Sequence, residues 1–143
     1  MNVYKGIEHL DKLDLSGTVC FDTETLQLQP EKARMRLVQL GTKANDTVVL
    51  IDCRQLDRED WQNLRHFFSG TERDWLAHNA VFDLGWLQAH DIYPAGFVRC
   101  TMLASRLIEN GIPNVRHSLD KLVKRYLKRE LPKELQKSDW SGD

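Results

Sequence analysis

The sequence has few cysteines, no long apolar run and almost no net charge, and each of these absences excludes a class of protein. Its three cysteines, Cys20, Cys53 and Cys100, lie far apart without a CxxC or Cys/His spacing, which excludes a disulfide framework and a Cys/His metal site. We interpret them as reduced, small apolar residues. No stretch approaches the roughly 20 apolar residues of a membrane span, and residues 1–17 lack the layout of a signal peptide. We therefore expect a cytoplasmic protein that contacts no membrane.

The net charge is close to zero but unevenly distributed. A formal charge of −1 at pH 7 argues against a protein that binds nucleic acid through bulk positive charge. Residues 116–133, however, hold seven Lys or Arg and two Asp or Glu, a local charge of +5, so the rest of the chain carries −6. This asymmetry is typical of a protein that needs acidic groups in one place and a cationic surface in another.

Length and composition indicate one domain. The chain has 143 residues, of which 41% are hydrophobic and 29% charged, so it is long enough to bury a sizeable core. It shows no internal repeat, no low-complexity tract and no Pro/Ser-rich linker. We therefore expect a single domain over residues 1–143.

Residue patterns predict a hairpin followed by alternating strands and helices. Residues 18–24 are typical of a buried strand, and residues 34–43 and 46–53 flank the turn sequence ANDT as an antiparallel hairpin. Further strands are expected over 74–79 and 96–100. Helices are expected over 58–69 after an N-cap at Asp57, over 80–92, over 101–111, and from Ser118 to Pro132. This order predicts an α/β fold with a mixed sheet flanked by helices.

The last predicted helix has an apolar and a basic face. Its apolar stripe, in which we expect Tyr126 to face the core, consists of Leu119, Leu122, Val123, Tyr126 and Leu127. The basic residues are Lys121, Lys124, Arg125, Lys128 and Arg129. Lys124 and Arg125 could follow the backbone of a single-stranded nucleic acid, or they could belong to a solvated helix face. The sequence leaves both interpretations open.

Three acids stand out by their positions. Asp22 and Glu24, in FDTETLQL, end the first buried strand, and residues i and i+2 of a strand face the same side. Two like charges raise each other's pKa unless something positive lies between them. Asp83 lies near the start of helix 80–92 among apolar neighbours, where a carboxylate needs a partner. The helix N-terminus is the structural alternative to a functional role for Asp83.

The three acids favour a metal site. Without a suitable Cys/His set, carboxylate oxygens favour hard divalent cations, Mg²⁺ or Mn²⁺. Two such ions at the end of a sheet suit phosphodiester chemistry, in which they hold the attacking and leaving oxygens. We therefore expect Asp22, Glu24 and Asp83 to converge on one pocket that holds divalent cations.

Three segments, in order, resemble the signatures of a known family. FDTETLQL, HNAVFDLGWL and HSLDKLVKRYL…LQKSDWSGD are similar to those of the DEDD (DnaQ-like) 3′–5′ exonucleases. The similarity covers nearly the whole chain and is closest to the proofreading exonuclease domain of family A DNA polymerases, with ribonuclease D a near relative. It implies a ribonuclease H-like fold, two divalent cations, and single-stranded 3′ ends of DNA or RNA as the substrate.

The resemblance also assigns roles to the acids and their neighbours. It implies that Asp22 bridges both cations, that Glu24 binds the cation on the nucleophile side, and that Asp83 binds the one on the leaving-group side. It implies that Thr25 and Leu28 grip the terminal nucleotide, with Leu28 as an apolar wedge. Leu28 could instead be a loop residue that covers the core.

Asn79 matches a polar residue that lies beside the scissile end in the family. Its alternative role is a helix N-cap ahead of Ala80, and the two roles are compatible. A smaller departure is Cys100, which stands where the family usually has an acid. This change removes a supporting carboxylate and no direct ligand.

The family's third signature, Tyr-x-x-x-Asp on a further helix, does not occur before Asp143. Tyr126 with Glu130 has the right spacing but Tyr126 is expected in the core, and Asp139 is a weak substitute for the missing ligand. His117 with Asp120 has the wrong spacing. We therefore expect this polypeptide to bind cations weakly and to cleave slowly or not at all. It is either part of a longer chain or completed by a second polypeptide.

The leading hypothesis from the sequence is a metal-dependent 3′–5′ exonuclease that acts on DNA and proofreads for a polymerase. A ribonuclease D-like enzyme that acts on RNA is the first alternative, because nothing in the sequence reads or rejects a 2′-hydroxyl. The second alternative is a non-catalytic module that binds strand ends or a polymerase partner.

Overall fold

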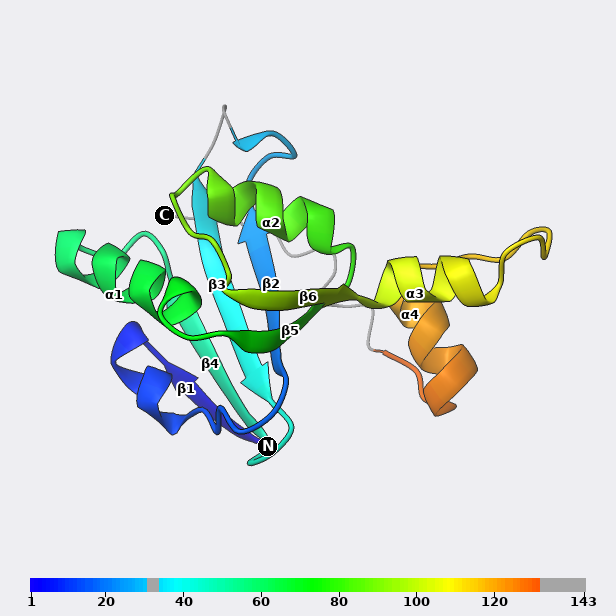
Figure 1. Ribbon diagram of the computed structural model, residues 1–143, viewed down its shortest axis with the longest axis horizontal. Coiled ribbons are helices and arrows are strands. Elements are labelled where there is room, and N and C mark those ends of the chain that lie inside the picture. The colour runs from blue at the N-terminus through cyan, green and yellow to red at the C-terminus, as the bar shows by residue number, and fades with distance from the viewer. Residues whose placement is uncertain (31–33, 132–143) are drawn as a thin grey trace.

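The structure is a computed structural model that describes residues 1–30 and 34–131. Within these ranges six strands form one mixed sheet in the order β1-β4-β3-β2-β5-β6 (Figure 1). The strands are β1 (Asn2–Lys5), β2 (Val19–Thr25), β3 (Met35–Thr42), β4 (Thr47–Asp52), β5 (Arg73–Ala77) and β6 (Gly96–Cys100). The pairs β2/β3 and β3/β4 are antiparallel and the other pairs are parallel. The predicted hairpin and the predicted mixed sheet are both confirmed.

The edge strand β1 and the helix that follows it were not predicted. Its four residues, three of them exposed, pair in parallel with β4. The 3₁₀-helix η1 (Ile7–Lys12) lies between this strand and β2 in the sequence. A strand this short has no clear alternation of apolar and polar residues. Its pairing depends on β4, which lies more than 40 residues further along the chain.

Two helices cover one face of the sheet and enclose the core. They are α1 (Arg58–Ser69) and α2 (Ala80–Gln88), and both lie on the near side of the sheet in Figure 1. Asp57 caps α1 as predicted, since its side chain accepts a hydrogen bond from the backbone of Asp60 in a reciprocal capping box. The centre of the core is aromatic: the rings of Phe68 and Trp75 stack 4.8 Å apart, and Phe21 meets both rings edge-on.

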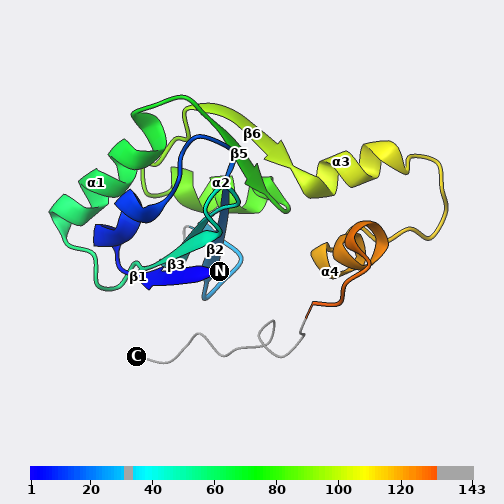
Figure 2. The ribbon, with the colours of Figure 1, turned by 90° about the horizontal axis from the view of Figure 1, so that it is seen from below.

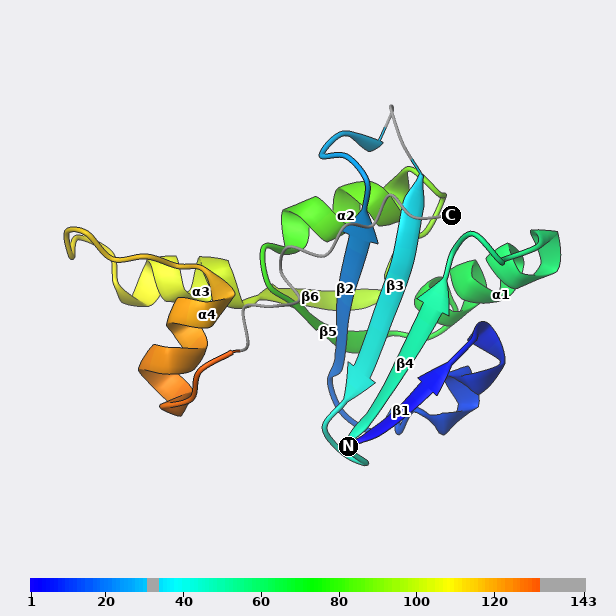
Figure 3. The ribbon, with the colours of Figure 1, turned by 180° about the vertical axis from the view of Figure 1, so that it is seen from behind.

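The opposite face of β2, β3 and β4 carries no helix among the described residues, as Figure 3 shows. Cys20 and Asp22, which point to this face, are exposed, whereas Phe21 and Thr23 are buried beneath the helices. The described cysteines are free thiols; Cys53 is buried and Cys20 is exposed. Cys20 therefore does not pack in the core, although the strand that contains it was expected to be buried.

The chain leaves the sheet through β6 and forms a separate arm. Helix α3 (Thr101–Ile108), helix α4 (Leu119–Leu122) and a turn of π-helix, η3 (Val123–Leu127), make up this arm, which projects from the sheet in all three ribbon views (Figures 1 to 3). No described helix is long and apolar enough to cross a membrane.

The last predicted helix is shorter than expected. It ends at Leu127, because Lys128 takes a left-handed conformation with φ of 54°. Its apolar stripe faces α3 across a cavity of about 320 Å³, so it does not reach the main core. Tyr126 is 48% exposed, and the expectation that it lies in the core is wrong.

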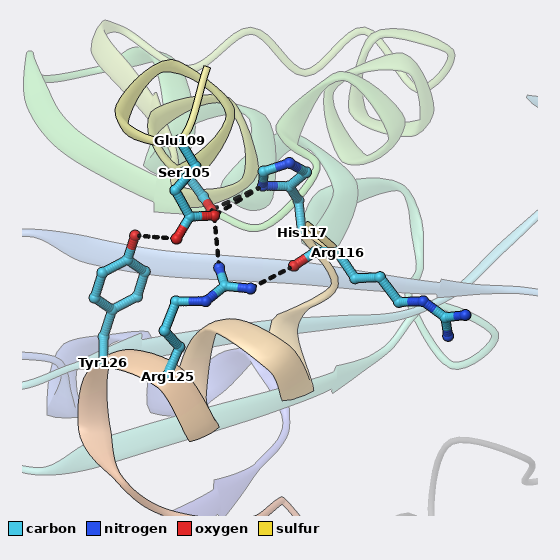
Figure 4. Close-up of polar contacts among 6 residues, drawn as sticks. All are labelled: Ser105, Glu109, Arg116, His117, Arg125 and Tyr126. Carbon is cyan, nitrogen blue, oxygen red and sulfur yellow. Dashed lines mark hydrogen bonds and ion pairs between the residues drawn. The ribbon is translucent and has the colours of Figure 1, made fainter. Parts of the chain in front are cut away.

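A buried carboxylate holds the arm together (Figure 4). Glu109, just after α3, accepts hydrogen bonds from Arg125 Nη1 at 2.7 Å and from Tyr126 Oη at 3.0 Å. Its side chain is only 10% exposed. His117 Nδ1 lies 2.9 Å from Ser105 Oγ and 3.7 Å from the same carboxylate. These contacts tie α3 to η3 and to the loop between α3 and α4.

The Glu109 contacts predict a localised loss of stability on truncation. Glu109→Ala leaves the guanidinium of Arg125 without its carboxylate, which we expect to cost about 1–3 kcal/mol. The matched control is Glu130→Ala, which removes a surface ion pair with Lys124 and costs at most about 1 kcal/mol. Amide hydrogen exchange over residues 101–127 measures both effects. Equal exchange in the two variants would contradict the role given to Glu109.

Candidate active site

The acids Asp22 and Glu24 lie side by side at the carboxyl end of β2. Burial alternates along this strand, so Val19, Phe21 and Thr23 face the core and the residues between them face the opposite side. The regular pairing of β2 with β3 shifts between Glu24 and Thr25. The two carboxylates therefore stand where the strand leaves the sheet.

Asp83 approaches the same strand from the core side. It lies in the first turn of α2 and is 2% exposed. Its Oδ1 atom accepts hydrogen bonds from the backbone N–H of Thr23 at 2.9 Å and from Thr23 Oγ1 at 2.7 Å. The partner that this buried acid requires is therefore the inward-facing residue between Asp22 and Glu24, in addition to the helix N-terminus.

Gln39 is a site residue that sequence reasoning missed. It lies directly opposite Asp22 in the β2/β3 register. Its Nε2 group donates to Asp22 Oδ2 at 3.2 Å and to Glu24 Oε1 at 3.4 Å. A neutral amide therefore holds the two carboxylates together. Gln39 lies within the predicted hairpin strand 34–43, but only the register shows which residues it meets.

Negative charge is poorly compensated at this end of the sheet. Partial burial raises the pKa of Asp22 to about 7, and the charges of Asp83 and Glu24 add to that effect. The pKa of Glu24 is also raised, first by burial and then by Asp83. Burial raises the pKa of Asp83, although its hydrogen bonds from Thr23 oppose the shift. No Lys or Arg of the described residues forms an ion pair with any of these three acids.

These carboxylates fit a hard divalent cation in chemistry and charge. Asp22, Glu24 and Asp83 supply oxygen ligands, and a cation would relieve the repulsion that raises their pKa values. They do not form a closed site, since no three acidic, His or Cys side chains in the described ranges stand close enough to share an ion. The three acids influence one another's pKa values, but their convergence on one cation-binding pocket stays a prediction.

The predicted substrate residues near the acids have mixed outcomes. Leu28 is 84% exposed, so it does not cover the core. Thr25 lies at the end of β2, where its hydroxyl donates to the carbonyl of Gln27. Asn79 does precede α2, but it has a left-handed backbone and its side chain makes no capping hydrogen bond. Asn79 is thus the N-cap residue of α2, as expected, but its side chain does not cap the helix.

Lys124 and Arg125 are not brought to the acids. Both lie on the arm, which is separate from the carboxyl end of β2 in Figures 1 and 3. Lys124 Nζ donates to Glu130 at 2.8 Å, and Arg125 is engaged by Glu109 and by the carbonyl of Arg116. Their predicted contact with nucleic acid remains a prediction. Asp139 lies outside the described residues.

Cys100, which replaces an acid of the family pattern, ends β6 beside the start of α2. Its Sγ atom accepts a hydrogen bond from the backbone N–H of Ala80 at 3.4 Å. Burial raises the pKa of this thiol, but the surrounding backbone N–H groups outweigh it and the net shift is downward. The thiol therefore occupies a position where backbone donors favour an anionic group.

The raised pKa of Asp22 predicts a pH-dependent stability in metal-free buffer. A carboxyl whose pKa is about 7 in the folded chain and 3.8 without perturbation binds its proton more tightly when folded. The free energy of unfolding should therefore fall as pH rises from about 4 to about 7. Asp22→Asn should flatten this fall, measured as melting temperature against pH in EDTA. An unchanged profile in the variant would contradict the electrostatic account of the site.

Comparison with known proteins assigns the chain to a family. A family model described as a 3′–5′ exonuclease matches residues 5–143. DNA polymerase I of Aquifex aeolicus (strain VF5) is 34% identical over 133 residues, which is 93% of this chain and 20% of the polymerase. The chain thus spans about a fifth of the length of that curated relative.

Solved structures agree with this match. Brucella melitensis NrnC with bound Mg²⁺ is 25% identical with a TM-score of 0.72, over 99% of this chain and 67% of that one. The EXO domain of Aedes aegypti Nibbler has a TM-score of 0.78 at 20% identity, over 99% of this chain and 75% of that one, and it supports the fold alone. On the family match and the polymerase relative, the chain belongs to the 3′–5′ exonuclease family.

Proposed function

We propose that the chain is a metal-dependent 3′–5′ exonuclease domain that removes nucleotides from DNA 3′ ends. The observation that carries this proposal is the arrangement of Asp22 and Glu24 on one side of β2 and Asp83, anchored by Thr23, on the other. Three carboxylates with raised pKa values and no described cationic partner need divalent cations to neutralise them.

In this proposal the three acids act from the two sides of β2. Asp22 and Glu24 would hold cations from the open face of the sheet, and Asp83 would present the oxygen that Thr23 does not engage. Mg²⁺ or Mn²⁺ would supply the positive charge that stabilises a phosphodiester transition state. Gln39 keeps Asp22 and Glu24 adjacent before a cation arrives.

The loop after β2 is suited to the terminal nucleotide. Leu26 and Leu28 are exposed apolar side chains that follow the acids directly, and an exposed leucine offers a surface on which a base can pack. Thr25, whose hydroxyl already bonds to the backbone of Gln27, shapes the start of this loop. We propose that Thr25 and Leu28 grip the last nucleotide and that Asn79 lies beside the scissile phosphate.

DNA is favoured as the substrate because the curated relative is a DNA polymerase that shares 34% identity over 93% of this chain. Proofreading for a family A polymerase is the corresponding cellular role. The RNA-degrading alternative and the non-catalytic module remain the competing functions. A polymerase region, or a second polypeptide that supplies a further carboxylate, would be the partner.

The proposal predicts weak, metal-dependent cleavage by the 143-residue polypeptide. With three acids and no described Tyr-x-x-x-Asp pair at the site, hydrolysis of a 3′-labelled single strand should be slow. It should depend on Mn²⁺ or Mg²⁺ and fall at least about 100-fold in Asp22→Asn, because an enzyme of this type derives most of its rate from the charge at the site. Asp11→Asn, an exposed acid paired with Lys12, is the matched control.

Matched DNA and RNA oligonucleotides of one sequence distinguish the substrates in the same assay. Faster loss of the DNA 3′ nucleotide supports the proposal, and faster loss of the RNA nucleotide supports the ribonuclease D-like alternative. Cleavage that survives Asp22→Asn would contradict the assignment of the site. Binding of strand ends without any cleavage, even at millimolar Mn²⁺, would favour the non-catalytic module.

A further inference from the structure

A polar cavity lies at the end of the sheet where β3 begins and β4 ends. Its volume is about 630 Å³, in the range of sites that hold small ligands. The side chains that give it its character are Arg34, Arg36, Arg54, Arg65, Trp61 and His90. Among the residues that the structure describes, no acidic side chain lines it. We infer that this arginine pocket binds a phosphate group.

The charge in the arginine pocket is strongly one-sided. Four guanidinium groups line it, and Asp52, the last residue of β4, is a carboxylate in contact with one of them. Asp52 accepts two short hydrogen bonds from Arg54, at 2.9 and 2.7 Å, and also faces Arg36. Within the described ranges, one carboxylate faces these four guanidinium groups, which leaves a positive excess. Planar guanidinium groups match the oxygens of a phosphate in pairs.

One hydrogen-bond donor of Arg36 lacks an acceptor among the described residues. Its Nε atom is buried and has no hydrogen-bond partner among the described residues. A buried donor of a charged group that lacks an acceptor is costly. The backbone of Arg36 is fixed, since its carbonyl accepts from the N–H of Cys53 at 2.9 Å. Rotation of the Arg36 side chain, which lines the pocket, would bring this donor to an anion there without any movement of the strand.

The opposite wall of the pocket is held rigid. Arg65 Nε donates to the carbonyl of His90 at 3.0 Å, which uses one of the five donors of the guanidinium. His90 Nδ1 lies 3.0 Å from the carbonyl of Trp86, so this nitrogen carries the proton. The His90 ring stacks on Trp61 with centroids 5.0 Å apart and an angle of 13°. Groups that are already ordered lose little entropy when they bind.

The position of the pocket indicates where its phosphate comes from. Leu26 and Gln27, which also line it, follow directly after Glu24 and Thr25. The pocket therefore adjoins the candidate active site, and this part of the inference rests on the proposed function. Two sources share the chemistry: the backbone of the strand being degraded, or a nucleoside monophosphate. The existence of the phosphate site does not depend on the proposed function, because it is inferred from the residues of the arginine pocket alone.

Binding measured without metal tests the inference. In EDTA, the 143-residue protein is titrated with inorganic phosphate, with deoxyadenosine 5′-monophosphate, and with a short single-stranded oligodeoxynucleotide. We expect Arg36→Met combined with Arg65→Met to weaken binding at least about tenfold, since each charged hydrogen bond to phosphate is worth more than that factor. Arg58→Met, at the exposed start of the same helix α1, should bind within about twofold of the unchanged protein.

The controls keep the outcomes separate. If the double variant loses its circular dichroism signal, Arg65→Met alone is used, and we expect it to weaken binding at least about tenfold. Loss restricted to the oligonucleotide identifies the strand backbone as the source, and loss for deoxyadenosine 5′-monophosphate identifies a free nucleotide. No binding of any probe, or equal binding by the variants and Arg58→Met, overturns the inference. The binding assay contains no metal and the cleavage assay requires it, so a failed cleavage assay and a failed phosphate site are told apart.

Discussion

The hydrogen bonds from Thr23 to Asp83 are the contact on which the candidate site depends. They join the first turn of α2 to the carboxyl-terminal part of β2. Thr23 lies there between Asp22 and Glu24, whose side chains face the opposite side of the strand. A buried acid is thus fixed behind two partly buried ones, and all three acquire raised pKa values. This arrangement gives up stability in the metal-free protein. Functional sites are where such a loss is expected, and divalent cations would recover it.

Much of the fold and part of the site follow from local patterns. The alternation in residues 18–24 predicts that Asp22 and Glu24 share a face, and the ANDT turn predicts the hairpin. Asp83 could be recognised as a buried acid, but its partner Thr23 lies 60 residues earlier and is found only through tertiary packing. Gln39 is hidden for the same reason, since cross-strand contacts depend on the register.

The wrong expectation for Tyr126 has an identifiable cause. The stripe that includes Tyr126 is apolar at helical spacing, which predicts burial but does not identify what covers it. In the structure α3 is its neighbour, and a phenol at the rim of that contact reaches Glu109. The sequence also indicated a cationic surface on this helix. There Arg125 is neutralised by Glu109, whereas the arginine pocket draws its residues from separate segments that no local pattern connects.

The central claim is that divalent cations hold Asp22, Glu24 and Asp83 together. The most direct test is a titration of the ¹⁵N-labelled protein with Mg²⁺, followed by the side-chain amide signal of Gln39 and the backbone amide signal of Thr23. These groups donate to the three carboxylates, so both signals should shift along one saturating curve, and neither should shift in Asp22→Asn. Signals that stay in place at millimolar Mg²⁺, or that move equally in the variant, would contradict the account.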